Sequence, residues 1–139
     1  MPEATVLAND ANDPDAADAL AQQVAHLGTL DGLWLNAGYG AVAAVDDIDA
    51  DFFNKVMHTN VRGPVLLLAR LAQYLNDGAA VVLTSSTATY EGSPIASVYA
   101  ATKAALIAIA RNWAAALAPR RVRVNIIVPG AIGTDFTPL

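Results

Sequence analysis

Two side chains in the second half of the sequence have the spacing of an acid–base pair. Tyr99 and Lys103 are four residues apart, which places them on the same face of a helix. A tyrosine hydroxyl is a weak acid at neutral pH, and a neighbouring lysine ammonium favours its phenolate form. The pair can therefore give a proton to a carbonyl oxygen or take one from an alcohol. Alone, the spacing favours an ordinary helix-surface pair, which is common.

A serine lies where it can assist such a reaction. Ser86 precedes Tyr99 by thirteen residues and follows the most strongly apolar run of the chain. Ligands of open α/β sheets gather beyond the carboxyl ends of strands, and a hydroxyl there can stabilise charge that develops on a substrate oxygen. Thr84 and Ser85 are adjacent candidates for this role. The alternative is a serine that only caps the following loop.

Small and polar residues follow the other apolar runs as well. Asn36-Ala37-Gly38 and Pro129-Gly130 both occupy such positions. The hexapeptide from Gly38 to Ala43 matches the G-x-G-x-x-G/A pattern of dinucleotide-binding turns. That turn requires a helix to open at the glycines, and here the next helical pattern begins about ten residues later. We therefore interpret this match as a loop.

Apolar runs alternate with helical patterns, which predicts β–α units around a parallel sheet. Gly63-Pro64 lies inside the second helical pattern and should kink or split it. Asp13 is the expected N-cap of the first helix, with Pro14 at its first position. Residues 4–8 form a short apolar run at which a further strand could end. The expected strands cover residues 32–36, 79–86 and 122–128, and the expected helices cover about residues 14–27, 49–75 and 97–117.

Composition excludes several classes of protein. The chain has 139 residues, 55% of them hydrophobic and 15% charged, which suits one folded domain rather than a disordered segment. It contains no cysteine and two histidines, so we predict neither a disulfide scaffold nor a metal site. The net charge is −5, which argues against nucleic-acid binding. Arg120, Arg121 and Arg123 are interpreted as a solvated turn before a strand.

The sequence gives no sign of membrane association. The N-terminus is acidic and polar, unlike a signal peptide. The most apolar stretch, residues 98–118, is interrupted by charged and polar side chains, whereas a membrane span needs about 20 nearly uncharged residues. We predict a cytoplasmic protein without a membrane span.

Trp34 and Trp113 lie in a predicted strand and a predicted helix and are expected in the core or at an interface.

Taken together, these motifs resemble the short-chain dehydrogenase/reductase family in order and spacing, from about Asn9 to Thr134. Leu35 is a mild departure, because the family often has a second asparagine there. The resemblance implies a Rossmann-like doubly wound parallel sheet and an NAD(P)-dependent oxidoreductase that interconverts an alcohol and a carbonyl. It leaves the choice between NAD and NADP open. The matching residues are Leu35 to Gly38, Asn60, Thr84 to Ser86, Tyr99 to Lys103, Arg123 to Asn125 and Pro129-Gly130.

The resemblance also implies a role for each matching residue. Tyr99 would be the catalytic acid/base, and Lys103 would assist it and hold the nicotinamide ribose. Ser86 would polarise the substrate carbonyl, and Asn60 would support a proton-relaying chain of water. The remaining cofactor contacts would be Asp10 and Ala11 at the adenine, Asn36, Ala37 and Gly38 beside the cofactor, and Pro129, Gly130, Ile132 and Thr134 at the nicotinamide carboxamide.

The family's glycine-rich turn, its first two strands and its C-terminal substrate segment have no counterpart here. We therefore expect residues 1–139 to form a single partial domain with an incomplete sheet, weak cofactor affinity and a tendency to associate. Helices 51–75 and 97–117 resemble the family's subunit interface, which favours a homo-oligomer. The substrate would be a small or medium alcohol or ketone. The alternatives are a truncated, non-catalytic remnant that serves as a binding or oligomerisation module, and an epimerase or dehydratase that uses the same Tyr–Lys pair.

Overall fold

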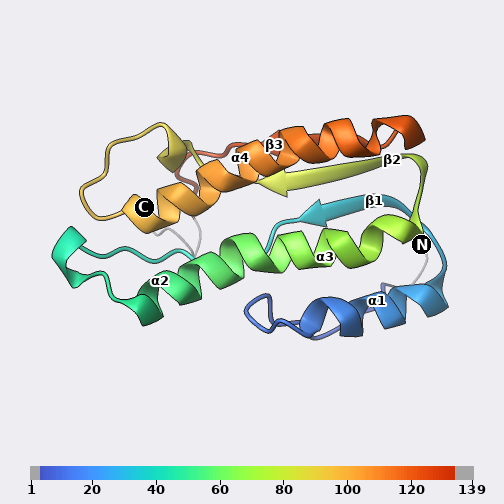
Figure 1. Cartoon of the computed structure of the whole chain (residues 1–139), viewed down its shortest axis with the longest axis horizontal. Coiled ribbons are helices and arrows are strands. Elements are labelled where there is room, and N and C mark those ends of the chain that lie inside the picture. Colours follow the sequence, from blue (N-terminus) through green and yellow to red (C-terminus); the bar gives the residue numbers. More distant parts are fainter. Residues whose placement is uncertain (1–3, 134–139) are drawn as a thin grey trace.

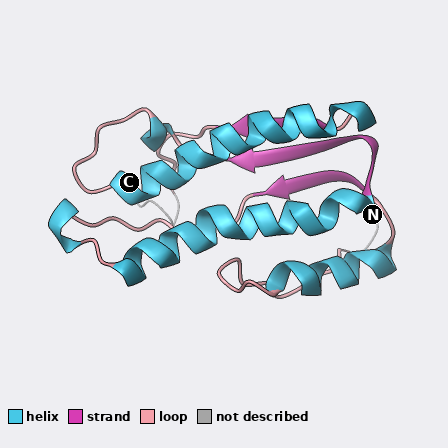
Figure 2. Ribbon diagram, in the orientation of Figure 1, coloured by secondary structure: helices cyan, strands magenta, loops and turns pink. Residues whose placement is uncertain are grey.

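The computed structural model describes residues 4–133, which form a three-stranded sheet with helices packed on one of its faces (Figures 1 and 2). Short 3₁₀ turns lie at Val45–Asp47, Ala72–Tyr74, Thr87–Thr89 and Ala118–Arg120. The main elements are α1 (Ala16–Leu27), β1 (Leu30–Leu35), α2 (Ala50–Met57), a π-helical segment (His58–Arg62), α3 (Gly63–Leu71), β2 (Leu75–Thr84), α4 (Ser97–Leu117) and β3 (Arg123–Ile127).

The three strands are parallel, as the alternating pattern predicts, and they lie in the order β1-β2-β3. Leu35 lies opposite Leu83, and Thr84 lies opposite Ile127. The carboxyl ends of all three strands therefore meet at one edge of the sheet. Figure 1 shows the loops that follow β1 and β2 at this same end of the molecule.

The core lies between the sheet and the helices. Val81 and Leu83 of β2 are completely buried, and Leu68 of α3 and Leu106 of α4 belong to the same apolar cluster. A second, smaller cluster joins α1 to α3. Trp34 is on the opposite face of the sheet and is 61% exposed, so within the described chain it is not in the core, and its position at an interface stays a prediction. Trp113 does pack against the core.

The helix predicted for residues 49–75 is interrupted directly before the Gly63-Pro64 pair, as this pair predicts. Proline has no N–H to donate, so the Asn60 carbonyl lacks its α-helical partner. Before the proline, the Gly63 N–H donates to the carbonyl of His58, five residues back, and not to the residue four back as in an α-helix. A π-helical segment therefore separates α2 from α3. π-bulges of this kind are frequent at functional sites.

Gly63 is also required by a close approach between chain segments. A Cβ built at this position would lie 2.6 Å from the Ala11 carbonyl oxygen. Alanine is the better helix former by about 1 kcal/mol, yet we expect Gly63→Ala to lower the free energy of unfolding by about 1–3 kcal/mol through overpacking. Urea denaturation measures the change. Gly92→Ala, where an added Cβ meets no atom within 4 Å, is the control, and equal effects of the two substitutions would refute the expectation.

The boundaries of several elements differ from the predicted ones. The helix α1 begins at Ala16, about two residues later than predicted, and Asp15 precedes it in a helical conformation without a side-chain cap bond. Asp13 makes the bonds expected of the predicted cap: its carboxylate accepts the Asp15 N–H, and its carbonyl accepts the Ala16 N–H. The strand β2 begins at Leu75, four residues early, because Leu75 pairs with Leu30 across an irregularity. Residues 4–8 form no strand; a lone extended segment has no ladder partner in the described chain. No helix within residues 4–133 has the length and apolar character needed to cross a membrane.

Candidate active site

A cavity of about 820 Å³ opens at the carboxyl ends of the strands, as predicted for a parallel sheet. Eight of the expected site residues line it: Asn36, Gly38, Ser86, Tyr99, Lys103, Pro129, Gly130 and Ile132. Thr84 and Ser85, the alternative candidates for the hydroxyl role, line it too. The lining residues that were not predicted are Gly40, Val42, Thr87, Ala88, Glu91 and Ala131.

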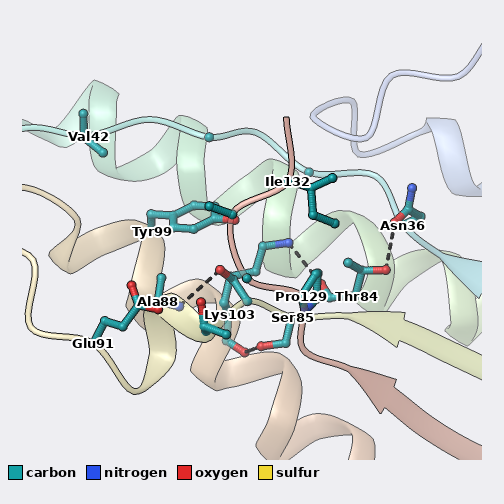
Figure 3. Close-up of a pocket in the computed structure, with 16 residues that line it drawn as sticks. Asn36, Val42, Thr84, Ser85, Ala88, Glu91, Tyr99, Lys103, Pro129 and Ile132 are labelled. Atoms are coloured by element: carbon teal, nitrogen blue, oxygen red, sulfur yellow. Dashed lines mark hydrogen bonds between the residues drawn. The ribbon is translucent and has the colours of Figure 1, made fainter. Parts of the chain in front are cut away.

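Lys103 is the cation of this cavity. It is buried, and its Nζ donates a hydrogen bond of 3.1 Å to the Thr84 carbonyl oxygen. The same nitrogen lies 5.7 Å from the centre of the Tyr99 ring, and the Tyr99 hydroxyl points to the side where the ammonium lies (Figure 3). Burial lowers the pKa of Lys103, because removal from water disfavours the charged form.

This lowered pKa predicts a pH dependence of stability. Between the folded pKa and the ordinary value of about 10.4, the unfolded chain binds one more proton than the folded chain. Lys103 therefore makes the free energy of unfolding rise with pH across that interval. We expect wild type to gain stability relative to Lys103→Met as the pH is raised toward about 10, in urea denaturation at a series of pH values. Parallel profiles for the two proteins would contradict this.

The three hydroxyl groups at the end of β2 have different partners. Ser85 is buried, and its Oγ donates to the Lys103 carbonyl oxygen at 2.8 Å. Thr84 Oγ1 donates to Asn36 Oδ1. Ser86 Oγ accepts a bond of 3.2 Å from the Ala88 N–H, which leaves the Ser86 hydroxyl hydrogen for a different acceptor. Of the three, Ser86 is the hydroxyl best placed to donate to a ligand in the cavity.

Asn60 lies behind the cavity and does not line it. The side chain is completely buried. Its Oδ1 accepts from the Tyr39 N–H at 2.6 Å, and its Nδ2 donates to the Tyr39 carbonyl and to Thr102 Oγ1. Thr102 Oγ1 in turn donates to the Tyr99 carbonyl. The Asn60 amide therefore fixes the loop after β1 to the helix that carries Tyr99 and Lys103.

Asp10 and Ala11 lie away from this cavity. Asp10 lines a separate hollow of about 430 Å³ beside α1, and its carboxylate accepts the Asn12 N–H at 2.9 Å. Arg62 holds the same loop by donating to the Asn12 carbonyl. Ala37 lines neither cavity. Thr134, the last expected contact, is outside the described residues.

The lining residues that sequence reasoning missed come from loops. Gly40 and Val42 belong to the loop after β1, and no helix opens at these glycines, as we predicted for the accidental dinucleotide pattern. Ala88 and Glu91 belong to the loop after β2. No periodic pattern marks such residues, and only their position after a strand end could have indicated them.

Comparisons with known proteins identify the family. A family model described as enoyl-(acyl carrier protein) reductase matches residues 1–138. Versicolorin reductase stcU of Emericella nidulans is 36% identical over 129 residues, covering 91% of this chain and 49% of that protein. The human mitochondrial dehydrogenase/reductase SDR family member 2 is 37% identical over 125 residues, covering 88% and 45%. The chain belongs to the short-chain dehydrogenase/reductase family and spans about half the length of these relatives.

Solved structures agree with the sequence matches. A short-chain dehydrogenase from Burkholderia cenocepacia in complex with NADP superimposes with a TM-score of 0.90 and 34% identity, covering 95% of this chain and 55% of that one. A dehydrogenase/reductase from Sinorhizobium meliloti gives a TM-score of 0.93 and 31% identity, covering 98% and 55%. The predicted Rossmann-like fold is therefore confirmed. The chain matches about half the length of each of these two structures.

Proposed function

We propose that this chain carries the catalytic residues of an NAD(P)-dependent oxidoreductase that interconverts an alcohol and a carbonyl. One observation carries the proposal: the Lys103 ammonium, anchored on the Thr84 carbonyl, lies 5.7 Å from the ring of Tyr99 in a cavity that Ser86 also lines. An acid–base group, a cation and a hydroxyl donor are the parts that carbonyl reduction requires.

The cavity suits the nicotinamide and ribose end of such a cofactor. Lys103 and Tyr99 would hold the ribose, Asn36 would lie beside it, and Pro129 and Gly130 would contact the carboxamide. Gly38 leaves the necessary space, because a Cβ there would lie 3.2 Å from Lys103 Nζ. The Burkholderia relative binds NADP, which supports the assignment. Asp10, Ala11, Ala37, Ile132 and Thr134 complete the proposed cofactor contacts.

The side chains would act on the substrate oxygen in the direction of reduction. A nicotinamide cofactor bound in this cavity would be the source of the hydride that the carbonyl carbon receives. Ser86 donates a hydrogen bond to the carbonyl oxygen as negative charge develops on it. Tyr99 then gives its hydroxyl proton to that oxygen, and the positive charge of Lys103 stabilises the resulting phenolate. In the oxidative direction, Tyr99 takes the proton from the alcohol.

Asn60 would contribute through its backbone. Its side chain is committed to Tyr39 and Thr102, whereas its carbonyl lacks an α-helical partner because Pro64 follows four residues later. We propose that this carbonyl accepts the first water of a chain that returns the proton to Tyr99. The amide side chain links the π-helical segment to the loop after β1 and to α4.

Titration with NADH and NADPH tests the function directly. Nicotinamide fluorescence and solution mass are followed together, and initial rates with simple aryl ketones are then measured. Saturable binding followed by ketone turnover supports the proposal. Binding without turnover, and with an intact Tyr99, favours a non-catalytic binding module. If the full-length protein binds neither NADH nor NADPH, the proposed oxidoreductase function is rejected.

The substrate would occupy the part of the cavity on the other side of Tyr99 from Asn36 (Figure 3). Val42, which is 58% exposed, and Ala88 provide apolar surface there, and Glu91 is the acidic residue of the lining. We expect ketones with a cationic amine to have a KM about 3- to 10-fold lower than neutral isosteres, the range of one modest charge pair. In Glu91→Gln, steady-state kinetics should show no such preference. If the preference survives this substitution, Glu91 does not contact the substrate.

We also propose that two copies associate through residues 51–75 and 97–117. The outer surface of α4 carries the small side chains of Ala104, Ala108 and Ala115, and Phe53 of α2 is 46% exposed. Small residues allow two helices to approach closely, and an exposed aromatic ring gains by burial. Light scattering over a concentration series tests this, and a monomer at every concentration would reject it.

A further inference from the structure

We propose that Trp34 and Thr84 are positioning residues that set the orientation of the Asn36 side-chain amide, so that its nitrogen donates to an acceptor on the cofactor. The observation is a chain of hydrogen bonds across the ends of β1 and β2. The inference rests on the proposed function, because it assigns the acceptor to a ribose oxygen of the nicotinamide cofactor.

The chain consists of two well-formed hydrogen bonds. Trp34 Nε1 donates to Thr84 Oγ1 at 2.9 Å, and Thr84 Oγ1 donates to Asn36 Oδ1 at 2.8 Å. Both distances lie within the normal range for such bonds. Trp34 and Asn36 are two residues apart and therefore project from the same face of the sheet. Thr84 belongs to the neighbouring strand and joins them.

The chemistry of the three groups gives the chain a direction. An indole N–H can only donate, so the Thr84 oxygen accepts from Trp34. The threonine hydroxyl has one hydrogen of its own, and the Asn36 carbonyl oxygen takes it. The Asn36 amide nitrogen is then turned away from Thr84, as Figure 3 shows. Because Asn36 lines the cavity, it presents a donor to the ligand, and its acceptor is already used.

Thr84 also connects this chain to the acid–base pair. Its backbone carbonyl accepts from Lys103 Nζ at 3.1 Å. A single residue at the end of β2 therefore anchors the amide through its hydroxyl and the ammonium through its carbonyl. A shift of Thr84 would move both groups, whereas loss of its hydroxyl alone would affect Asn36 and leave the Lys103 contact in place.

Substitutions can separate these contributions. Trp34→Phe removes the N–H donor and keeps an aromatic ring. Thr84→Val removes the hydroxyl and keeps the shape and the carbonyl, whereas Thr84→Ser keeps the hydroxyl. Trp113→Phe is the matched control, because Trp113 packs against the core and does not line the cavity.

We expect the Kd for NADH or NADPH to rise about 3- to 10-fold in Trp34→Phe and Thr84→Val, the range for one neutral hydrogen bond. Thr84→Ser and Trp113→Phe should bind as wild type does. In Trp34→Phe, kcat at saturating cofactor should not change, because the chain positions the cofactor and takes no part in proton transfer. Wild-type Kd in both Trp34→Phe and Thr84→Val, or equal losses in Thr84→Ser and Thr84→Val, would overturn the proposal.

A second readout needs no cofactor. Hydrogen exchange of the Trp34 indole N–H, assigned by its absence in Trp34→Phe, should be slow in wild type and Thr84→Ser and fast in Thr84→Val. Equal exchange rates in the three proteins would show that the chain does not form in solution. A protein with slow indole exchange that binds neither nucleotide would instead reject the proposed function, and with it the role toward the cofactor.

Discussion

Replacement of Tyr99 with phenylalanine is expected to lower kcat by about 10³-fold, within the range for loss of a general acid–base group. Phenylalanine retains the ring that faces Lys103 but has no proton to give to the substrate oxygen. Cofactor binding should weaken far less than kcat falls, because the loss of one hydroxyl contact to the ribose is a modest change and Lys103 keeps its bond to the Thr84 carbonyl. Initial rates at saturating NADPH and ketone give kcat, and nicotinamide fluorescence gives the Kd.

The same chemical change at a second tyrosine provides the control. Tyr90 lies in the loop after β2, is 74% exposed and is absent from the cavity lining. Tyr90→Phe should therefore retain the wild-type kcat. If Tyr99→Phe keeps a similar rate, Tyr99 is not the acid/base, and a water or another hydroxyl must hold the transferred proton.

The placement of Ser86, Tyr99 and Lys103 around one cavity could be predicted because simple geometry governs it. Helical periodicity puts Tyr99 and Lys103 on one face. A parallel sheet brings the carboxyl ends of its strands to one edge, so Ser86 and Asn36 had to be near each other. These are rules about regular elements, and the structure follows them.

The contacts of Asn60 could not be predicted, because no rule about regular elements describes them. Its amide binds Tyr39, which lies 21 residues earlier in an irregular loop. The first turn of α1 shows the same contrast. Local capping chemistry describes the bonds of Asp13, whereas the bond from Asn9 Nδ2 to the Ala16 carbonyl lies outside any capping pattern.

The largest expected loss of stability follows from Asn60. Its amide is the hydrogen-bond partner of the Tyr39 N–H, the Tyr39 carbonyl and Thr102 Oγ1, in a completely buried position. Asn60→Ala leaves the two Tyr39 groups without this partner and opens a cavity, whereas Thr102 Oγ1 keeps its bond to the Tyr99 carbonyl. Because each buried unpaired group costs about 1–3 kcal/mol, we expect the free energy of unfolding to fall by about 3 kcal/mol or more. Urea denaturation measures it.

Asn112→Ala is the matched control, since Asn112 is exposed on α4 and its Nδ2 makes one bond, to the Ala108 carbonyl. Its effect should stay within about 0.5 kcal/mol. An equally small effect at Asn60 would mean that water replaces the lost amide and that the loop after β1 does not depend on it.

The kinetics then separate the role of the Asn60 side chain from that of its backbone carbonyl. A backbone carbonyl survives truncation of the side chain, so a relay through that carbonyl predicts a nearly normal kcat in Asn60→Ala at temperatures where the variant stays folded. A large fall in kcat in the folded variant would show instead that the amide must hold the π-helical segment in register for the relay to work.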